Sequence, residues 1–305
     1  MKTTAKTYQN VPPPQRKRLL TFRATHPYTQ LATNGTPWRY IASGRGDRAL
    51  LFLPGAFLKA DMWFNQILAL ETDHRIIAPD AYALQGLFDL DAVCDALVQT
   101  LDAAGIKKAT VIGISAGGGV AQLLLQTHPD RVEHAVFSHC GVLEHSSEAE
   151  RQTRRILWLV RILPLFVIRR ILKKMTTGET PSSSQWIPFH EAYIQEAIRN
   201  VDKPTVVRFL RSGLETRRRF KFVPEILESW PGSILILSSQ DDALSRPSIE
   251  KLQARYPEAK TELLEEGGHH TFLFFPEAYT AALRKFLLFS QKISRTSPVD
   301  NNPVP

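Results

Sequence analysis

The chain has 305 residues, of which 43% are hydrophobic and 22% are charged, and its formal net charge is +8. This balance is typical of a globular protein that forms one large α/β domain or two small ones. No run of about 18 uncharged apolar residues is present, which argues against a transmembrane helix. The two cysteines, Cys94 and Cys140, have the spacing of neither a zinc site nor a disulfide framework.

The two ends of the chain are polar and rich in proline. The first residues contain no apolar run, so we expect no secretory signal and a cytoplasmic protein. The stretch Pro12–Arg18 and the last thirteen residues have the composition of segments that do not fold. We therefore predict a disordered leader over 1–20 and a disordered tail over 293–305.

Between the ends, short apolar runs alternate with helical patterns. The predicted strands are Trp38–Ala42, Ala49–Leu53, Arg75–Ala78, Ala109–Ile114, Glu133–His139, Ser233–Ser238 and Lys260–Leu264. The predicted helices are Asp89–Ala104, Gly117–Thr127, Pro247–Tyr256 and Pro276–Ser290. Continuous apolar strands that alternate with helices predict an α/β fold with a mostly parallel, doubly wound sheet.

One long segment interrupts this alternation. Residues 143–228 are helix-like, basic and rich in Trp, Phe and Leu, and they follow the predicted strand Glu133–His139. An insertion at the carboxyl end of a strand lies over the region where α/β proteins bind ligands. We therefore predict a helical lid over 143–228, inserted into a core formed by 21–142 and 229–292.

One serine lies where a strand turns into a helix. The β-branched run that begins at Ala109 ends in Gly113-Ile-Ser115-Ala-Gly117. A sharp strand-to-helix turn leaves its apex residue strained, which only small neighbours permit, and it holds the serine oxygen above the edge of the sheet. The pattern predicts a nucleophile elbow at Ser115, although a Gly-rich turn with a capping serine has the same sequence.

A serine becomes an effective nucleophile when a histidine takes its proton and a carboxylate orients that histidine. One later strand is followed at once by Asp241 and Asp242, and the next by a Gly-Gly turn that carries His269 and His270. This is the order Ser, Asp, His of an elbow-bearing protein. We expect His269 to be the base and Asp242, or alternatively Asp241, to orient it. His270 is expected to support the site or to contact the lid.

Acyl transfer also needs fixed N–H donors for the negative charge that develops on the substrate oxygen. One donor is expected to be the backbone N–H of Ala116, directly after the nucleophile. The other is expected from the loop Pro54–Phe57, where Ala56 and Phe57 are both candidates.

These segments resemble the α/β-hydrolase fold over roughly residues 35–290. The resemblance implies a serine hydrolase that passes through an acyl-enzyme, and no metal, flavin or nucleotide motif is present, so we expect no cofactor and no metal. Two departures from the family's pattern are Pro54-Gly55, where His-Gly is common, and Ala81–Gly86, where Arg-Gly-x-Gly is common. The resemblance is carried by Leu53–Ala56, Ile76–Asp80, Gly113–Gly117, Gln240–Leu244 and Glu266–His269.

Within this fold the chain is similar to the maspardin group in the segments Phe64–Leu70, Val93–Leu101 and Leu252–Ala259. This group keeps the elbow serine without a complete triad and is regarded as an adaptor that binds an acidic membrane-protein tail. The present chain retains Asp242 and His269. We therefore predict a serine hydrolase that acts on a carboxylic ester or similar small acyl substrate. The alternative is a non-catalytic adaptor for an acidic protein tail or a membrane surface.

The net charge is concentrated in one segment. Residues Arg151–Lys174 carry eight arginines and lysines and no acid, and their apolar residues are interrupted by Arg161 and Pro164. One interpretation is a lid helix pair with its cations in water. The other is a surface that meets an anionic membrane or an acidic protein, which would place the protein peripherally at membranes. We expect no nucleic acid partner, because aliphatic residues lie between the cations.

Overall fold

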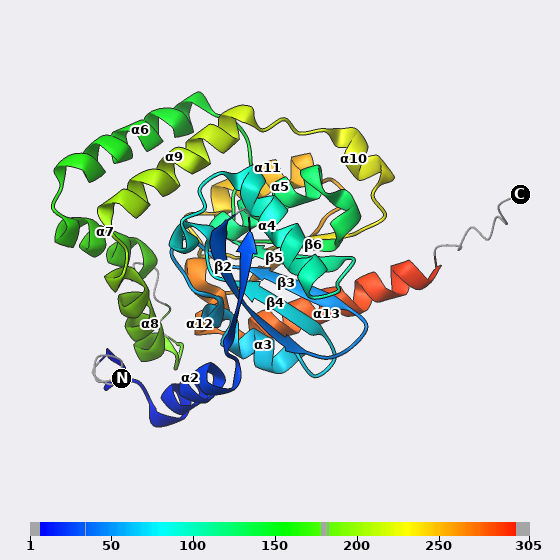
Figure 1. The fold of residues 1–305 in the computed structure, drawn as a ribbon, viewed down its shortest axis with the longest axis horizontal. Coiled ribbons are helices and arrows are strands. Elements are labelled where there is room, and N and C mark those ends of the chain that lie inside the picture. The colour runs from blue at the N-terminus through cyan, green and yellow to red at the C-terminus, as the bar shows by residue number, and fades with distance from the viewer. Residues whose placement is uncertain (1–6, 34, 178–180, 182, 297–305) are drawn as a thin grey trace, which may run out of the picture.

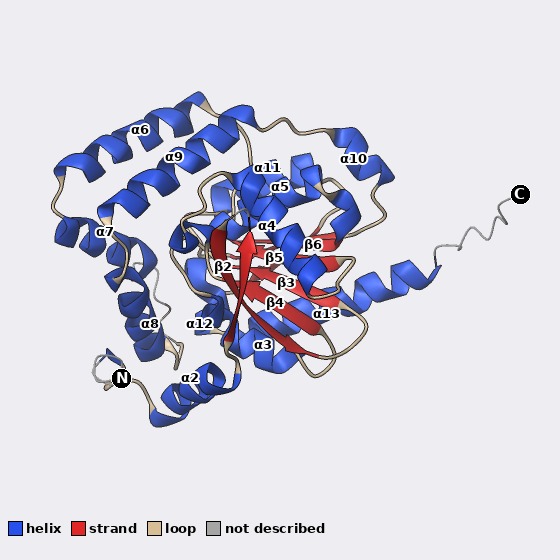
Figure 2. Cartoon of the chain, viewed as in Figure 1, coloured by secondary structure: helices blue, strands red, loops and turns tan. Residues whose placement is uncertain are grey.

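The computed structural model describes residues 7–33, 35–177, 181 and 183–296. Its centre is an eight-stranded sheet in the order β1-β2-β4-β3-β5-β6-β7-β8, drawn as arrows in Figures 1 and 2. The strands are β1 (Tyr28–Thr33), β2 (Thr36–Gly44), β3 (Ala49–Leu53), β4 (Arg75–Pro79), β5 (Ala109–Ile114), β6 (Val132–Ser138), β7 (Ile234–Ser239) and β8 (Lys260–Leu264).

The sheet is mostly parallel. β2 is antiparallel to both β1 and β4, and all other neighbours are parallel, so the carboxyl ends of β3 to β8 meet at one edge. The predicted α/β class with a doubly wound sheet is confirmed, and each predicted strand overlaps an observed one. The prediction missed β1, an edge strand whose side chains are mostly partly or fully exposed.

Both faces of the sheet are covered by helices. Successive residues of β3 enter different cores: Leu51 and Leu53 pack with one set of helices, and Leu50 and Phe52 with the other. The first set is α4 (Leu90–Ala103), α5 (Ala116–Thr127) and α11 (Ile249–Arg255). The second is α3 (Phe64–Leu70), α12 (Thr271–Phe274) and α13 (Pro276–Thr296). Short 3-10 turns are Ala60–Trp63, Tyr82–Gln85, Pro129–Arg131, Arg246–Ser248 and Gly268–His270.

The prediction of a disordered leader is wrong for the part that the structure describes. Residues 7–12 lead into helix α2 (Pro13–Thr25), which starts at a proline and buries Leu19 and Phe22. Arg23 on this helix forms an ion pair with Asp61 at 2.6 Å. A few apolar residues at helical spacing therefore hold a mostly polar segment in place. Residues 1–6 lie outside the described part of the chain.

The other predicted end is only partly described. Helix α13 continues through Thr296, which is past the start of the predicted tail at residue 293. Residues 297–305 lie outside the described part.

The insertion between β6 and β7, the segment predicted as a lid and called the lid below, is helical. It contains α6 (Ser147–Ile162), α7 (Leu165–Thr177), α8 (Ile187–Arg199), α9 (Lys203–Arg219) and α10 (Pro224–Ser229). In Figure 1, α6 runs beside α9, and α7 follows at the outer edge of the molecule, next to α8. Pro164 separates α6 from α7, because proline lacks the N–H that would continue the helix and Leu163 before it is extended.

Candidate active site

Ser115 occupies the turn between β5 and α5 in a conformation that is rare for a residue with a side chain. Its φ is 53° and its ψ is −115°. The backbone N–H of Ser115 donates to the Ser138 carbonyl oxygen at 3.0 Å, and the Ser115 carbonyl oxygen accepts from the N–H of Gly118 at 3.0 Å. These bonds on both sides hold the strained residue at the carboxyl edge of the sheet.

Most of the glycines around Ser115 are required because other atoms approach them closely. A Cβ atom at Gly113 would lie 2.3 Å from the Gly117 carbonyl oxygen, and one at Gly117 would lie 2.4 Å from that of Leu53. At Gly118 a Cβ would lie 2.5 Å from Cys140 Sγ. By contrast, no atom lies within 4 Å of a Cβ at Gly119. Three of the four glycines therefore shape the turn.

His269 and Asp242 are brought together from two different loops. The Nδ1 atom of His269 lies 3.2 and 3.1 Å from the two carboxylate oxygens of Asp242. Asp242 is fully buried at the end of β7, while the His269 side chain keeps about a seventh of its surface exposed. Because Nδ1 faces the carboxylate, Nε2 is the ring nitrogen left for a substrate or for Ser115.

The adjacent Asp241 has a different role. Its carboxylate oxygens accept the backbone N–H groups of Gly267 at 3.1 Å and Gly268 at 2.9 Å, directly before His269. Gly267 has a φ of 126°, and a Cβ there would lie 2.6 Å from Thr271 Oγ1. Asp241 thus fixes the turn that carries the histidine. Of the two predicted alternatives, the structure brings Asp242 to the imidazole.

The carboxylate of Asp242 is held in its charged form. Burial raises its pKa, but the hydrogen bonds from His269 and Ser245 and the charge of His269 bring that pKa well below its usual range. The backbone N–H groups of Leu244 and Ser245 also donate to Oδ1, at 3.0 and 3.1 Å. A buried carboxylate with this many donors is a fixed negative charge beneath the ring.

His139 is a further histidine at the site that the sequence analysis did not identify. It follows β6 with a φ of 46°, and its ring lies edge-on to that of His269 with centroids 6.1 Å apart. Its Nδ1 is 2.8 Å from Ser138 Oγ and its Nε2 is 3.1 Å from Thr271 Oγ1. Burial, followed by the charge of His269, lowers the pKa of His139 to about 3. No sequence motif identifies this residue, because its place beside His269 results from the way the strands are arranged in the sheet.

His270 contacts the lid, which is one of the two roles expected for it. Its Nδ1 lies 2.8 Å from Nε2 of His190 on the lid helix α8. Burial lowers the pKa of both rings, that of His190 to about 3. The two neutral rings therefore share a hydrogen bond that joins the loop after β8 to the lid.

The predicted oxyanion donors lie beside Ser115. Ala116 is the first residue of α5, and Phe57 has a φ of 60° in the loop after β3. Among the backbone hydrogen bonds of the described residues, none uses the N–H of Ala116, Ala56 or Phe57. All three residues line the cavities at Ser115, and both candidates in the loop remain available.

Two cavities meet at Ser115 and His269. The first, of about 370 Å³, is here called the apolar cavity, because Ser115, His269 and His270 are its only polar lining residues within the described chain. Its walls come mainly from lid helices α6 to α9. The second, of about 350 Å³, is lined by apolar residues together with polar ones that include Thr153, Ser245 and Arg217.

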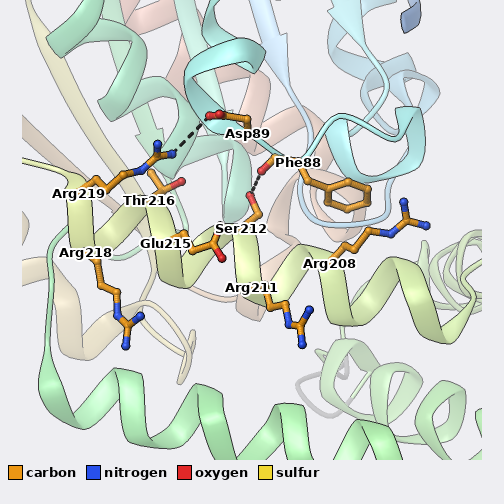
Figure 3. A pocket seen from close by; sticks show the side chains of 9 residues that line it. All are labelled: Phe88, Asp89, Arg208, Arg211, Ser212, Glu215, Thr216, Arg218 and Arg219. Carbon is orange, nitrogen blue, oxygen red and sulfur yellow. Dashed lines mark hydrogen bonds and ion pairs between the residues drawn. The ribbon is translucent and has the colours of Figure 1, made fainter.

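A separate groove of about 480 Å³ lies between α9 and the start of α4 (Figure 3) and shares no residue with the cavities at Ser115. Three of its four arginines have partners: Arg219 lies 3.4 Å from Asp89, Arg208 stacks on the Phe88 ring at 5.0 Å, and Arg218 donates to Glu150 on α6 at 2.9 Å. These contacts tie the lid helix α9 to α4 and α6.

The profile of the alpha/beta hydrolase family matches residues 50–283. The chain belongs to this family. Similar alpha/beta hydrolases include a putative carbamate hydrolase RutD of Caulobacter segnis, 26% identical over 81% of this chain and 90% of the relative. Human maspardin is 27% identical over 83% of this chain and 80% of its own length.

Solved structures of this family share the fold. A hydrolase from Pseudomonas aeruginosa superposes with a TM-score of 0.70 at 18% identity, covering 85% of this chain and 98% of that one. The esterase EaEST from Exiguobacterium antarcticum gives a TM-score of 0.69 at 16% identity, covering 85% and 99%.

Among the described residues, no cluster of three or more His, Cys, Asp or Glu side chains is arranged to hold a metal ion. Likewise, none of the described helices has the length and apolar character needed to span a bilayer.

Proposed function

We propose that this alpha/beta hydrolase is a serine hydrolase that cleaves carboxylic esters with an apolar acyl group. The observation that carries the proposal is the hydrogen-bonded pair Asp242–His269, which faces the same cavity as the strained Ser115. A buried carboxylate, an imidazole and a serine on an elbow form the arrangement that activates a hydroxyl group for attack on a carbonyl carbon.

In the proposed reaction, Ser115 Oγ attacks the ester carbonyl while His269 Nε2 takes its proton. Asp242 stabilises the imidazolium that forms. The N–H of Ala116 and that of Ala56 or Phe57 donate to the oxyanion, an effect that contributes about 3 kcal/mol per donor in serine hydrolases. The alcohol leaves with the proton of His269, which produces an acyl-enzyme. Water, deprotonated by His269, then releases the acid and restores Ser115.

The lining of the apolar cavity supports an apolar acyl group. Burying each methylene group of a substrate there is worth about 0.8 kcal/mol, whereas a small charged substrate gains nothing from such walls. A carbamate, the substrate class named for the RutD relatives, has a carbonyl that the same serine could attack. The cavity favours esters over small carbamates, and a substrate panel should contain both.

Covalent labelling with a fluorophosphonate tests the proposal. The wild type is expected to be labelled, and Ser115→Ala is expected to lose the label while it unfolds at an unchanged temperature. An ester series of increasing acyl length should then be hydrolysed by the wild type alone. Folded wild-type protein without Ser115-dependent labelling would favour the adaptor role suggested by the maspardin resemblance.

A further inference from the structure

The corner between lid helices α6 and α7 exposes large apolar side chains. Phe166 is 74% exposed, Trp158 61% and Ile162 56%, although residues of this kind normally lie in the core. Further exposed apolar residues, Ile156, Leu159 and Ile171, flank them on the same two helices. Figure 1 shows this corner at the outer edge of the molecule, away from the sheet.

Cations share the outer faces of these helices with the apolar residues. Arg151, Arg155, Trp158 and Ile162 are spaced by four, three and four residues, which places them on one stripe of α6. On α7, Phe166, Arg170 and Lys174 are spaced by four residues each, so they form a similar stripe. All seven side chains are exposed.

Most of these cations lack a partner of opposite charge. Arg154 forms an ion pair with Glu150 at 3.0 Å. Within the described chain, no carboxylate forms an ion pair with Arg151, Arg155, Arg161, Arg170 or Lys174. The corner is therefore an apolar tip surrounded by uncompensated positive charge.

The two helices of this corner also form part of the wall of the apolar cavity. Ile156, Leu159 and Ile171 line the cavity and are also 44%, 42% and 45% exposed. A chain of methylene groups could thus pass from the outer surface, between α6 and α7, to Ser115 without leaving apolar surroundings.

We propose that the α6–α7 corner docks on an anionic phospholipid bilayer, and that long-chain acyl esters enter the apolar cavity from that bilayer. Docking is independent of the reaction, whereas the entry of esters rests on the proposed hydrolase function. Trp and Phe at the tip would lie among the lipid headgroups, and the arginines would contact their phosphates.

A bilayer fits this surface better than an acidic protein segment does. The exposed apolar residues stand on a protruding corner, and the cavity beside them extends to Ser115, which suits a single acyl chain. An acidic segment would satisfy the cations but would leave Trp158 and Phe166 in water.

Co-sedimentation with vesicles tests docking. The wild type is expected to bind vesicles of phosphatidylcholine and phosphatidylserine in equal amounts, and to bind phosphatidylcholine alone weakly. Arg155→Gln with Arg170→Gln should lower the affinity about thirty-fold, and Trp158→Ala with Phe166→Ala about tenfold or more. The control pair Lys107→Gln with Lys108→Gln, between α4 and β5, and the control Leu288→Ala on α13, which is 60% exposed, should bind like the wild type.

Equal binding to both kinds of vesicle, or unchanged binding of the two corner variants, would overturn docking. Binding of a polyglutamate peptide in place of vesicles would assign the surface to an acidic protein and would also overturn it.

Hydrolysis tests the entry route separately. Neither Trp158 nor Phe166 lines the cavity, so Trp158→Ala with Phe166→Ala should keep the wild-type rate on a soluble butyrate ester. The same variant should lose most of its activity on a long-chain ester held in anionic vesicles. Retained activity there overturns the entry route. Docking by a wild type that hydrolyses neither ester would refute the hydrolase function and leave docking intact.

Discussion

Asp241 and Asp242 are neighbours in the chain, yet their carboxylates hold different parts of the loop that carries His269. Asp242 lies 3.1 Å from the imidazole Nδ1, and Asp241 accepts the N–H groups of Gly267 and Gly268 just before that histidine. One carboxylate therefore sets the charge and orientation of the ring, and the other sets the path of the backbone beneath it.

Because Asp241 and Asp242 make different contacts, we expect different effects when each is replaced by asparagine. Asp242→Asn should lower kcat roughly 10⁴-fold with little change in KM, because the ring loses the charge that stabilises its protonated form and fixes its tautomer. Asp241→Asn keeps the pair Asp242–His269 and should lower kcat far less. It should instead reduce the free energy of unfolding by about 1.5–3 kcal/mol, through weakened charge-assisted hydrogen bonds. Ester kinetics and urea unfolding of both variants measure these effects, and equal losses of kcat would contradict the assignment.

Alanine substitutions at Gly113 and at Gly119 of the elbow are expected to change stability in opposite directions. Gly113→Ala should destabilise the fold by at least about 1–3 kcal/mol, because its Cβ would lie 2.3 Å from a backbone oxygen that cannot move aside. Gly119→Ala meets no atom within 4 Å and lies within α5, so it should raise stability by up to about 1 kcal/mol. Thermal unfolding compares the two variants. A stable Gly113→Ala protein would show that the turn can relax.

Much of this site could be predicted because its signals are local. The apolar runs that end at Leu53, Ile114 and Leu237 indicate three strand ends to within two residues, and the chemistry-bearing residues follow those ends in sequence. The sequence could not decide whether Asp241 or Asp242 contacts the histidine, because this depends on how the turn after β7 meets the loop after β8. His139 was missed for the same reason: its strained backbone and its two hydroxyl partners come from separate elements.

The missed elements had weaker signals. β1 lies at the sheet edge and does not alternate clearly between apolar and polar residues, although the Asn-Gly pair at 34–35 is a strong hairpin signal. Helix α2 is polar on average, so its composition suggested disorder. Its ion pairs from Arg23 to Asp61 and to Glu196 of the lid, together with the burial of Leu19 and Phe22, stabilise it.

Stability is expected to fall in mild acid, in part because of His134. Burial, followed by the charge of Arg48, lowers the pKa of this ring to about 4. The unfolded chain binds a proton there below about pH 6.5. Between about pH 6.5 and about pH 4 the unfolded state therefore binds more protons, so the free energy of unfolding decreases as the pH falls.

His134→Asn tests this contribution. The substitution should reduce the loss of stability between about pH 6.5 and about pH 4 by about 3 kcal/mol. Phe286→Leu loosens the ring contact with His134, whose centroids are 6.2 Å apart, without removing the titratable group. It should lower stability at every pH and keep the slope. Urea unfolding across this pH range measures both, and an unchanged slope in His134→Asn would refute the role of this residue.

The size of the apolar cavity predicts acyl-chain selectivity. Ala197 on α8 lines that cavity, and Ala197→Leu would fill part of it. Each methylene group of the substrate that no longer fits should cost about 0.8 kcal/mol, or about fourfold in kcat/KM, while short esters are unaffected. Thr153 lines only the second cavity, so Thr153→Val should keep the wild-type preference for acyl-chain length. Rates on a series of p-nitrophenyl esters decide the matter: a uniform loss over all chain lengths in Ala197→Leu would mean that the acyl group binds elsewhere.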